Sequence, residues 1–158
     1  MKIRRVSFDN RKQAFTVVAG GRTYEFPYAA MHPARGRLKV VRAGPDDEQG
    51  REAFTFETDV DEDGAVHMDN VLLHHGDPRA ERLDTLYKLT LEAEAALAET
   101  RISKRALARL LGTSMSQLGR LLDATNSTKS VEQMMALLRA LGREVEIVVR
   151  RRGPNAAA

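Results

Sequence analysis

The sequence predicts an α+β fold in which a small antiparallel β-rich domain comes first and an all-α domain ending in a β-strand follows. Three observations support this prediction. Short runs of β-branched and aromatic residues, separated by turn residues, fill the first half, whereas leucine-rich runs at helical spacing fill most of the second. All five phenylalanines fall in the first half, where they can fill a small core. The length of 158 residues allows one ordinary domain or two small ones.

The first half divides into six predicted strands with turn residues between them. The pair Gly20-Gly21 suits a tight hairpin, and Pro27 ends the third strand. Residues 28–37 are ambiguous, because Tyr28 to Met31 could form one helical turn. The predicted strands are Ile3 to Phe8, Ala14 to Val18, Arg22 to Phe26, Leu38 to Arg42, Ala53 to Thr58 and Ala65 to Leu73.

The second half predicts a series of capped helices. Asp77-Pro78 is typical of an N-cap followed by proline at the first helical position, and the apolar residues after it keep helical spacing to about residue 100. Ser103, Ser114 and Ser130 each stand where a helix N-cap is expected, and Gly142 ends the last helix. We therefore expect helices at about 78–100, 104–111, 114–123 and 131–141.

The residues after the last helix predict a terminal strand. Arg143 to Arg150 alternates, with three aliphatic residues on one face and charged residues on the other. The predicted domain boundary falls near Gly76. The β-rich domain then covers residues 1–76 and the helical domain residues 77–152, and residues 153–158 are expected to form a disordered tail.

Composition and charge exclude several classes of protein. The absence of cysteine excludes a disulfide framework, a thiolate metal site and a cysteine nucleophile. No apolar run approaches ~18 residues and no apolar segment follows the basic N-terminus, so we expect no membrane span, no secretory signal and a cytoplasmic location. Residues 1–80 contain 12 Lys/Arg against 13 Asp/Glu, and residues 81–158 contain 13 against 9, so the net charge of +3 arises in the second half.

Residues 104–122 contain the most informative pattern in the chain. A helix-turn-helix needs two short helices that cross steeply through a tight turn. Ala108 supplies a small residue at the crossing, Gly112 tolerates the positive φ of the turn, and Ser114 caps the second helix. A packed helical hairpin without a partner is the alternative interpretation. The apolar residues expected to hold the crossing angle are Leu107, Leu111, Leu118 and Leu121.

This stretch and its flanking helices, about residues 80–150, resemble the XRE family of phage-repressor-like DNA-binding domains. The continuation from Leu121-Leu122-Asp123-Ala124-Thr125-Asn126 to Glu144-Val145-Glu146-Ile147-Val148-Val149 is similar to a subgroup with a C-terminal strand. Many members of that subgroup are autoregulators or HigA-type antitoxins. The resemblance implies a bacterial regulator whose partner is double-stranded DNA.

The resemblance places the recognition helix at Ser114 to Leu122, with its N-terminal residues at base edges in the major groove. Gln117 can pair with adenine, Arg120 with guanine or a phosphate, and Met115 can contact a thymine methyl group. Glycine at position 119 costs about 1 kcal/mol relative to alanine, and it either lets the backbone approach DNA closely or removes a base contact. The predicted base contacts are Met115, Ser116, Gln117 and Arg120.

Two segments are predicted to contact DNA phosphates. The start of the preceding helix combines a serine cap with two cations, and the loop after the recognition helix carries polar residues and a lysine. Arg150-Arg151-Arg152 is either a DNA-backbone arm or a solvated end. The predicted phosphate contacts are Ser103, Lys104, Arg105, Ser114, Asn126, Thr128 and Lys129.

Other groups of chemically active residues are weaker. The acidic segment from Asp59 to Gly64 matches the first half of a calcium loop, but Asn70 stands where such a loop has glutamate, so an acidic turn is favoured. The histidines lack the i, i+4 spacing of a helical metal site, and no nucleophile-elbow motif is present. We therefore predict no metal, no cofactor and no enzymatic activity. The residues weighed as metal ligands are His67, Asp69, His74, His75 and Asp77.

The sequence thus predicts a two-domain regulator that binds duplex DNA as a homodimer, because one short recognition helix reads few base pairs and twofold pairing doubles that number. The terminal strand Glu144–Arg150 is the candidate dimer element. Three functions stay open: a transcriptional repressor or autoregulator, an antitoxin whose β-rich domain binds a toxin protein, and a ligand-binding or enzymatic β domain tethered to DNA. No motif assigns a role to residues 1–76.

Overall fold

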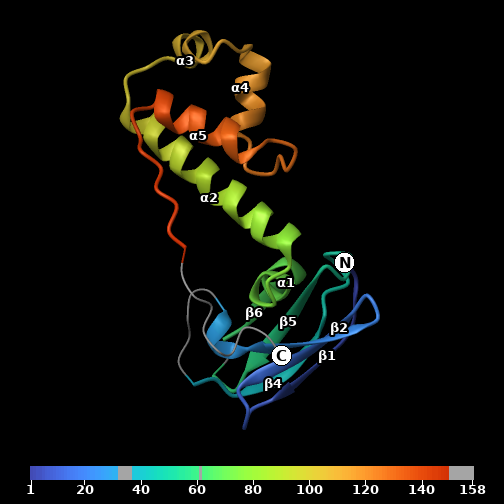
Figure 1. The fold of residues 1–158 in the computed structure, drawn as a ribbon. Coiled ribbons are helices and arrows are strands. Elements are labelled where there is room, and N and C mark those ends of the chain that lie inside the picture. The colour runs from blue at the N-terminus through green and yellow to red at the C-terminus, as the bar shows by residue number, and fades with distance from the viewer. Residues whose placement is uncertain (32–36, 61, 150–158) are drawn as a thin grey trace. The chain divides into compact units, whose positions relative to one another are not determined.

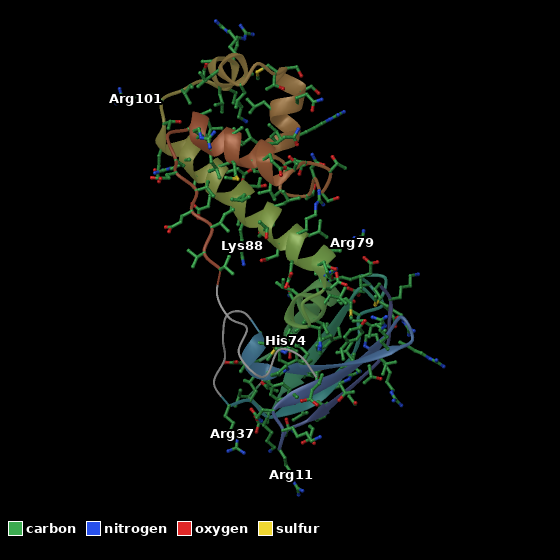
Figure 2. All side chains as sticks on the ribbon, in the orientation of Figure 1. Arg11, Arg37, His74, Arg79, Lys88 and Arg101 are labelled. Atoms are coloured by element: carbon green, nitrogen blue, oxygen red, sulfur yellow. The ribbon has the colours of Figure 1, made fainter. Side chains whose placement is uncertain are left out.

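The computed structural model describes residues 1–31, 37–60 and 62–149; Figure 1 shows the ribbon and Figure 2 adds the side chains. Contacts between residues divide the chain into two compact units, the first ending at Ala80 and the second beginning at Glu81. The boundary expected near Gly76 lies just before this division. Each unit has an apolar core of its own.

The first unit contains two three-stranded antiparallel sheets, in each of which neighbouring strands follow one another in the sequence. A short 3-10 helix follows the first sheet and an α-helix follows the second (Figure 1). The elements are β1 Ile3–Asp9, β2 Ala14–Ala19, β3 Arg22–Pro27, η1 Tyr28–Ala30, β4 Val40–Pro45, β5 Ala53–Thr58, β6 Gly64–His67 and α1 Met68–His74.

Aromatic rings from both sheets form the centre of the first core. Phe15 of β2 lies opposite Phe26 of β3, and both side chains are buried. The Phe15 ring centroid lies 4.6 Å from that of Tyr28 and 4.9 Å from that of Phe54 in β5. Phe56 of β5 is buried as well. The alternation of the strands therefore directs phenylalanines of both sheets into one core.

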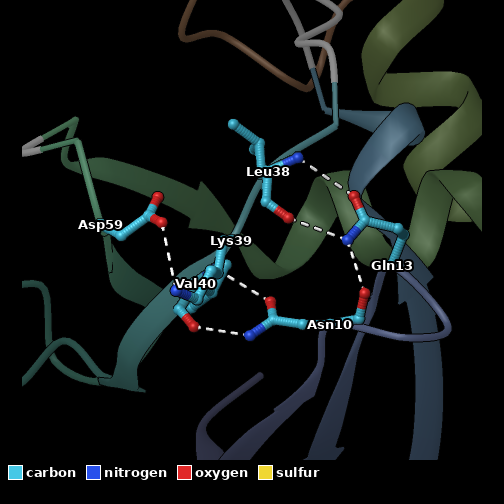
Figure 3. A network of polar contacts seen from close by, with 6 residues as sticks. All are labelled: Asn10, Gln13, Leu38, Lys39, Val40 and Asp59. Carbon is cyan, nitrogen blue, oxygen red and sulfur yellow. Dashed lines mark hydrogen bonds and ion pairs between the residues drawn. The ribbon is translucent and has the colours of Figure 1, made fainter.

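Two side-chain amides join the β1–β2 turn to the segment that leads into β4 (Figure 3). The Asn10 amide donates to the Val40 carbonyl oxygen at 2.8 Å and accepts from the Val40 N–H at 2.9 Å. The Gln13 amide makes the same pair of bonds with Leu38, at 2.8 and 3.1 Å. Burial raises the pKa of Tyr28 to about 12, so its hydroxyl stays protonated and donates to Asn10. β4 begins at Val40, which pairs with Thr58 of β5, two residues later than the sequence predicts.

The predicted strand from Ala65 to Leu73 is wrong beyond its third residue. β6 pairs with β5 only as far as His67, which lies opposite Ala53, the first residue of β5. The chain then turns into the helix α1, and the His67 Nδ1 atom accepts from the Asp69 N–H at 3.3 Å as the N-cap. The strand ends there because no partner strand continues beside it.

The described residues of the second unit form four helices around one core. Asp77 caps the long first helix, because its carboxylate accepts from the N–H groups of Arg79 and Ala80, each at 3.0 Å. Among the described residues, no helix is long and apolar enough to cross a membrane. The helices are α2 Pro78–Glu99, α3 Lys104–Leu110, α4 Met115–Leu122 and α5 Val131–Ala140.

The predicted fold class is wrong in its final element, because the helical domain does not end in a strand. Residues 143–149 form no regular secondary structure, and no described strand pairs with them. Arg143 forms an ion pair with Glu99 of α2, and Val145 packs against the helical core. Ile147 is 73% exposed and Val149 91% exposed. Alternating apolar and charged residues give a segment two different faces, but a strand also needs the edge of another strand to pair with. Positions 150–158, including the arginine run and the predicted tail, lie outside the described residues.

Candidate nucleic-acid interface

A glycine-containing turn connects α3 to α4. Gly112 has φ +63°, and its N–H donates to the Arg109 carbonyl oxygen at 3.0 Å. The next N–H, of Thr113, donates to the Ala108 carbonyl oxygen at 2.9 Å. These two bonds form a Schellman motif, which satisfies carbonyl groups at the end of α3 and reverses the chain direction. The turn therefore positions α4 immediately after α3.

Serine caps begin both helices of this pair. The Ser114 hydroxyl oxygen accepts from the Gln117 N–H at 3.1 Å, and the Ser103 hydroxyl oxygen accepts from the Ala106 N–H at 3.2 Å. Each cap satisfies one N–H group that has no partner within its helix. Both predicted N-caps are confirmed, and α4 begins at Met115, one residue after the predicted start.

Apolar side chains fix α3 and α4 against the rest of the second unit. Leu107, Ala108 and Leu118 are buried in the helical core, and Leu111 and Leu121 pack against it half-buried. Because both helices are anchored in one core, the residues on the outer side of α4 have fixed positions. A helix that contacts DNA bases needs such a fixed outer face.

The outer face of α4 carries all four residues that the sequence predicts as base contacts. All four are exposed, and Met115 is 49% exposed. Their spacing of three and four residues places Ser116, Gln117 and Arg120 on one side of the helix. A Cβ atom added at Gly119 would meet nothing within 4 Å, so this face is open there. The four residues are Met115, Ser116, Gln117 and Arg120.

At the start of α3, both predicted cations face solvent. Lys104 and Arg105 are exposed, and within the described ranges neither makes an ion pair. Ser103 and Ser114 are also exposed, although each hydroxyl already accepts the capping bond described above. The two cations are thus available to an anion that approaches this side of the unit.

Lys129 does not lie where a phosphate contact requires it. Its residue is 3% exposed, and its Nζ donates to the carbonyl oxygens of Leu121 at 2.9 Å and Asp123 at 2.6 Å. Burial lowers the pKa of its ammonium group, while the nearby Asp123 and Glu94 carboxylates oppose that effect. Lys129 therefore ties the end of α4 to the loop. The two hydrogen bonds satisfy an ammonium group that would be costly to bury without partners.

The other polar residues of this loop bond mainly to one another. The Asn126 amide donates to the Arg120 carbonyl oxygen at 2.9 Å and accepts from the Thr128 hydroxyl at 2.8 Å. Hydrogen bonds from Thr125 lower the pKa of the Asp123 carboxyl group. The predicted phosphate contacts Asn126 and Thr128 thus shape the loop, and Thr128 remains exposed.

Arg82 of α2 completes this loop and is absent from the sequence-based site. Its guanidinium group donates to the carbonyl oxygens of Ser127 at 3.1 Å and Lys129 at 3.0 Å. In the sequence, Arg82 precedes Ser127 by 45 residues and Lys129 by 47 residues. No motif or spacing in the sequence indicates it.

The histidines of the first unit have separate partners. His75 Nε2 lies 2.8 Å from the Glu25 carbonyl oxygen, and His67 Nδ1 lies 3.4 Å from an Asp69 carboxylate oxygen. Burial, followed by the neighbouring His75, lowers the pKa of His74, which is labelled in Figure 2. In the described part of the chain no three metal-binding side chains are grouped together, and position 61 of the acidic segment lies outside it.

A cavity of about 320 Å³ lies in the first unit, between β3, η1, β6 and α1. Its lining combines apolar side chains with the polar side chains of Asn70 and His74. The remaining lining residues are Phe26, Ala30, Met31, Ala65, Val66 and Leu73.

Comparison of the chain with protein-family models found no match. Searches of curated proteins and of solved structures also found none.

Proposed function

We propose that this protein is a sequence-specific double-stranded DNA-binding regulator of transcription, a repressor or autoregulator that reads the major groove with α4. One observation carries the proposal: the exposed face of α4, with Gln117 and Arg120, is held by a capped helix pair and a Schellman turn. A helix that presents an amide and a guanidinium group on one face can hydrogen-bond to base edges. The resemblance to the XRE family supports the same assignment.

The proposed contacts divide between bases and phosphates. Gln117 pairs with adenine, Arg120 pairs with guanine or a phosphate, and Met115 contacts a thymine methyl group. Lys104 and Arg105 neutralise phosphates at the start of α3. Lys129 is left out of the proposal, because its ammonium group is buried and bonded to two carbonyl oxygens.

We further propose that the regulator is a cytoplasmic homodimer on a pseudo-palindromic site. One α4 helix of eight residues reaches only a few base pairs, and twofold symmetry doubles the recognised sequence. The proposal requires no metal, cofactor or enzymatic reaction.

Selection of bound fragments from genomic DNA, followed by footprinting, tests this function. We expect enrichment of one sequence with two related half-sites, about 10 base pairs apart from centre to centre or a multiple of that spacing. Affinity should fall steeply with salt, because binding releases counterions from the phosphates. Selection that yields no common sequence would contradict the proposal.

The cavity of the first unit favours a second role, the sensing of a small ligand. Its volume of about 320 Å³ is at the lower end of the range for ligand pockets, and a lining that combines apolar side chains with polar groups suits a small amphipathic molecule. Binding of the amphipathic dye ANS tests it: fluorescence should rise with the native protein and not with Ala65→Trp, which fills the cavity. Equal fluorescence with both would reject this role.

An antitoxin would use the same reading helix and differ only in what the first unit binds. We therefore propose this role as the alternative to a repressor. Expression of the neighbouring reading frame alone tests it, since a toxin arrests growth unless this chain is expressed with it. Normal growth would reject the alternative and leave the DNA-binding proposal intact.

A further inference from the structure

One side of α2 carries an apolar stripe that no described residue covers. Tyr87 is 50% exposed and Leu91 43% exposed, and Ala95 and Ala98 are exposed as well. Their spacing of four, four and three residues aligns them along one side of the helix. The opposite side faces the helical core through Leu86 and other buried residues. The helix has 22 residues and is therefore about 33 Å long.

The charges beside this stripe differ between the two halves of α2. From Pro78 to Lys88 the helix carries three cations and two carboxylates, whereas from residue 89 to Glu99 it carries three carboxylates and no cation. Lys88 pairs with Asp84 at 2.7 Å and projects from α2 in Figure 2. Glu92 and Glu94 are exposed. The helix dipole adds to this asymmetry, since its N-terminal end is positive and its C-terminal end negative.

We propose that the α2 stripe, Tyr87, Leu91, Ala95 and Ala98, is the dimer interface and that it binds the same stripe of a second copy in antiparallel orientation. A twofold axis beside Leu91 brings the two Leu91 side chains together. It also places the bulky Tyr87 of one copy level with the small Ala95 of the other. Size and shape are thus self-complementary, as a twofold interface requires.

The charges select the antiparallel orientation. With the axis at Leu91, Lys88 of one copy lies on the same flank as Glu92 of the other, about 3 Å apart along the helix axes, and the contact occurs twice by symmetry. A parallel pair would instead place Lys88 beside Lys88 and glutamate beside glutamate, and it would align the two dipoles unfavourably. Asp84, half-buried on this side of α2, is already paired with Lys88.

This inference rests on the proposed homodimer and assigns its interface. The interface replaces the terminal segment 144–150, which was expected to be a strand and forms none within the described residues. The proposed α2 interface does not depend on DNA binding, so either proposal can fail without the other.

The absence of cysteine allows a direct test by disulfide cross-linking. Leu91→Cys places one thiol per chain next to the twofold axis, where the two Cα atoms come within disulfide reach of about 4.4–6.8 Å. We expect mild oxidation to convert this variant to a covalent dimer. Ala136→Cys, on an exposed position of α5, is the matched control and should remain monomeric on denaturing gels.

A third single-cysteine variant reports the orientation. In the antiparallel pair the two copies of residue 98 are about 21 Å apart, because seven residues of rise separate each from the axis. Ala98→Cys should therefore not cross-link. In a parallel pair each residue meets its own copy, so cross-linking at both 91 and 98 would overturn the proposed orientation.

Charge exchange tests the interface independently, by sedimentation equilibrium. Lys88→Glu should raise the dimer dissociation constant about tenfold, since two symmetric ion pairs become repulsive contacts. Adding Glu92→Lys to the same chain should restore most of the affinity, and circular dichroism should show equal helix content in all variants. A Lys88→Glu variant that dimerises as well as the native chain would overturn the interface.

The outcomes separate the two proposals. A dimer in solution without cross-linking at residue 91 rejects the α2 interface and keeps the homodimer. A monomer at tens of micromolar, both free and bound to DNA, rejects the interface and the homodimer together. Sequence-specific DNA binding survives either result.

Discussion

The two ends of α4 treat their polar groups in opposite ways. At the N-terminal end, Ser114 caps the helix and the three residues that follow it face solvent. At the C-terminal end, the side chains of Lys129 and Arg82 donate hydrogen bonds to backbone carbonyl oxygens. One end leaves donors available to a partner, and the other uses them to hold the helix in place.

The difference shows that a lysine of this helical unit can occupy one of two distinct environments. Lys104 is exposed and unpaired among the described residues, so it can neutralise a phosphate. Lys129 is buried, where an unpaired ammonium group would be costly, and two carbonyl oxygens stabilise it.

Replacing Lys129 should affect stability rather than DNA binding. Lys129→Met leaves the Leu121 and Asp123 carbonyl oxygens without their donor, so we expect a loss of about 2–3 kcal/mol in the free energy of unfolding. Urea denaturation measures it. Lys104→Met is the matched control and should change stability by less than about 0.5 kcal/mol. If Lys129→Met unfolds like the native chain but binds DNA more weakly, the assigned role is wrong.

Gly119 offers a test on the outer face of α4. Gly119→Ala should stabilise the helix by up to about 1 kcal/mol, because the added Cβ meets nothing within 4 Å. DNA affinity then distinguishes the two interpretations of this glycine: weaker binding indicates close approach of the backbone, and unchanged binding indicates a position without a contact. As a control, Gly112→Ala should destabilise the domain, since φ there is +63°.

Lys104 should contribute to DNA affinity without contributing to sequence preference. Lys104→Ala should weaken binding to all sequences alike and reduce the slope of log K against log salt by about 1. Titrations at several salt concentrations, with a selected and a scrambled duplex, measure both effects. A loss confined to the selected sequence would contradict the phosphate role.

The smallest expected effect is on acid stability. Because Thr125 lowers the folded-state pKa of Asp123 below its usual 3.8, the carboxylate stabilises the fold above that pH, and this contribution is lost as the pH falls through the lowered pKa. Thr125→Val should return the pKa of Asp123 toward 3.8, as NMR titration would show. On acidification, the loss of stability should then begin at a higher pH than in the native chain. Thr128→Val, which removes a hydrogen bond to the neutral Asn126, should leave the pKa unchanged.

Local signals explain why the helix pair could be predicted from the sequence. A serine at an N-cap and a glycine at the end of a helix act through neighbouring backbone groups, so Ser103, Gly112 and Ser114 indicate the boundaries directly. The stretch from Ala65 to Leu73 and the terminal segment were misassigned because a strand depends on a partner edge. Spacing within a segment cannot show whether such an edge exists.

The burial of Lys129 could not be predicted for a related reason. Its partners are carbonyl oxygens at the end of α4 and a loop that Arg82 holds from α2. A lysine in a polar loop is usually solvated, and the sequence carries no sign of that closure. The exposed residues of α4 were predictable because helical spacing alone separates them from the buried leucines.

The most direct test of the central claim, that α4 reads duplex DNA, is the affinity ratio between a selected site and a scrambled duplex for the native chain and for Gln117→Ala/Arg120→Ala. We expect the double variant to lose about 2–6 kcal/mol of discrimination, at roughly 1–3 kcal/mol for each side chain, while binding to the scrambled duplex changes little. The urea midpoint should stay the same, since both side chains are exposed. An unchanged ratio in a folded double variant would contradict the assignment of α4 as the recognition helix.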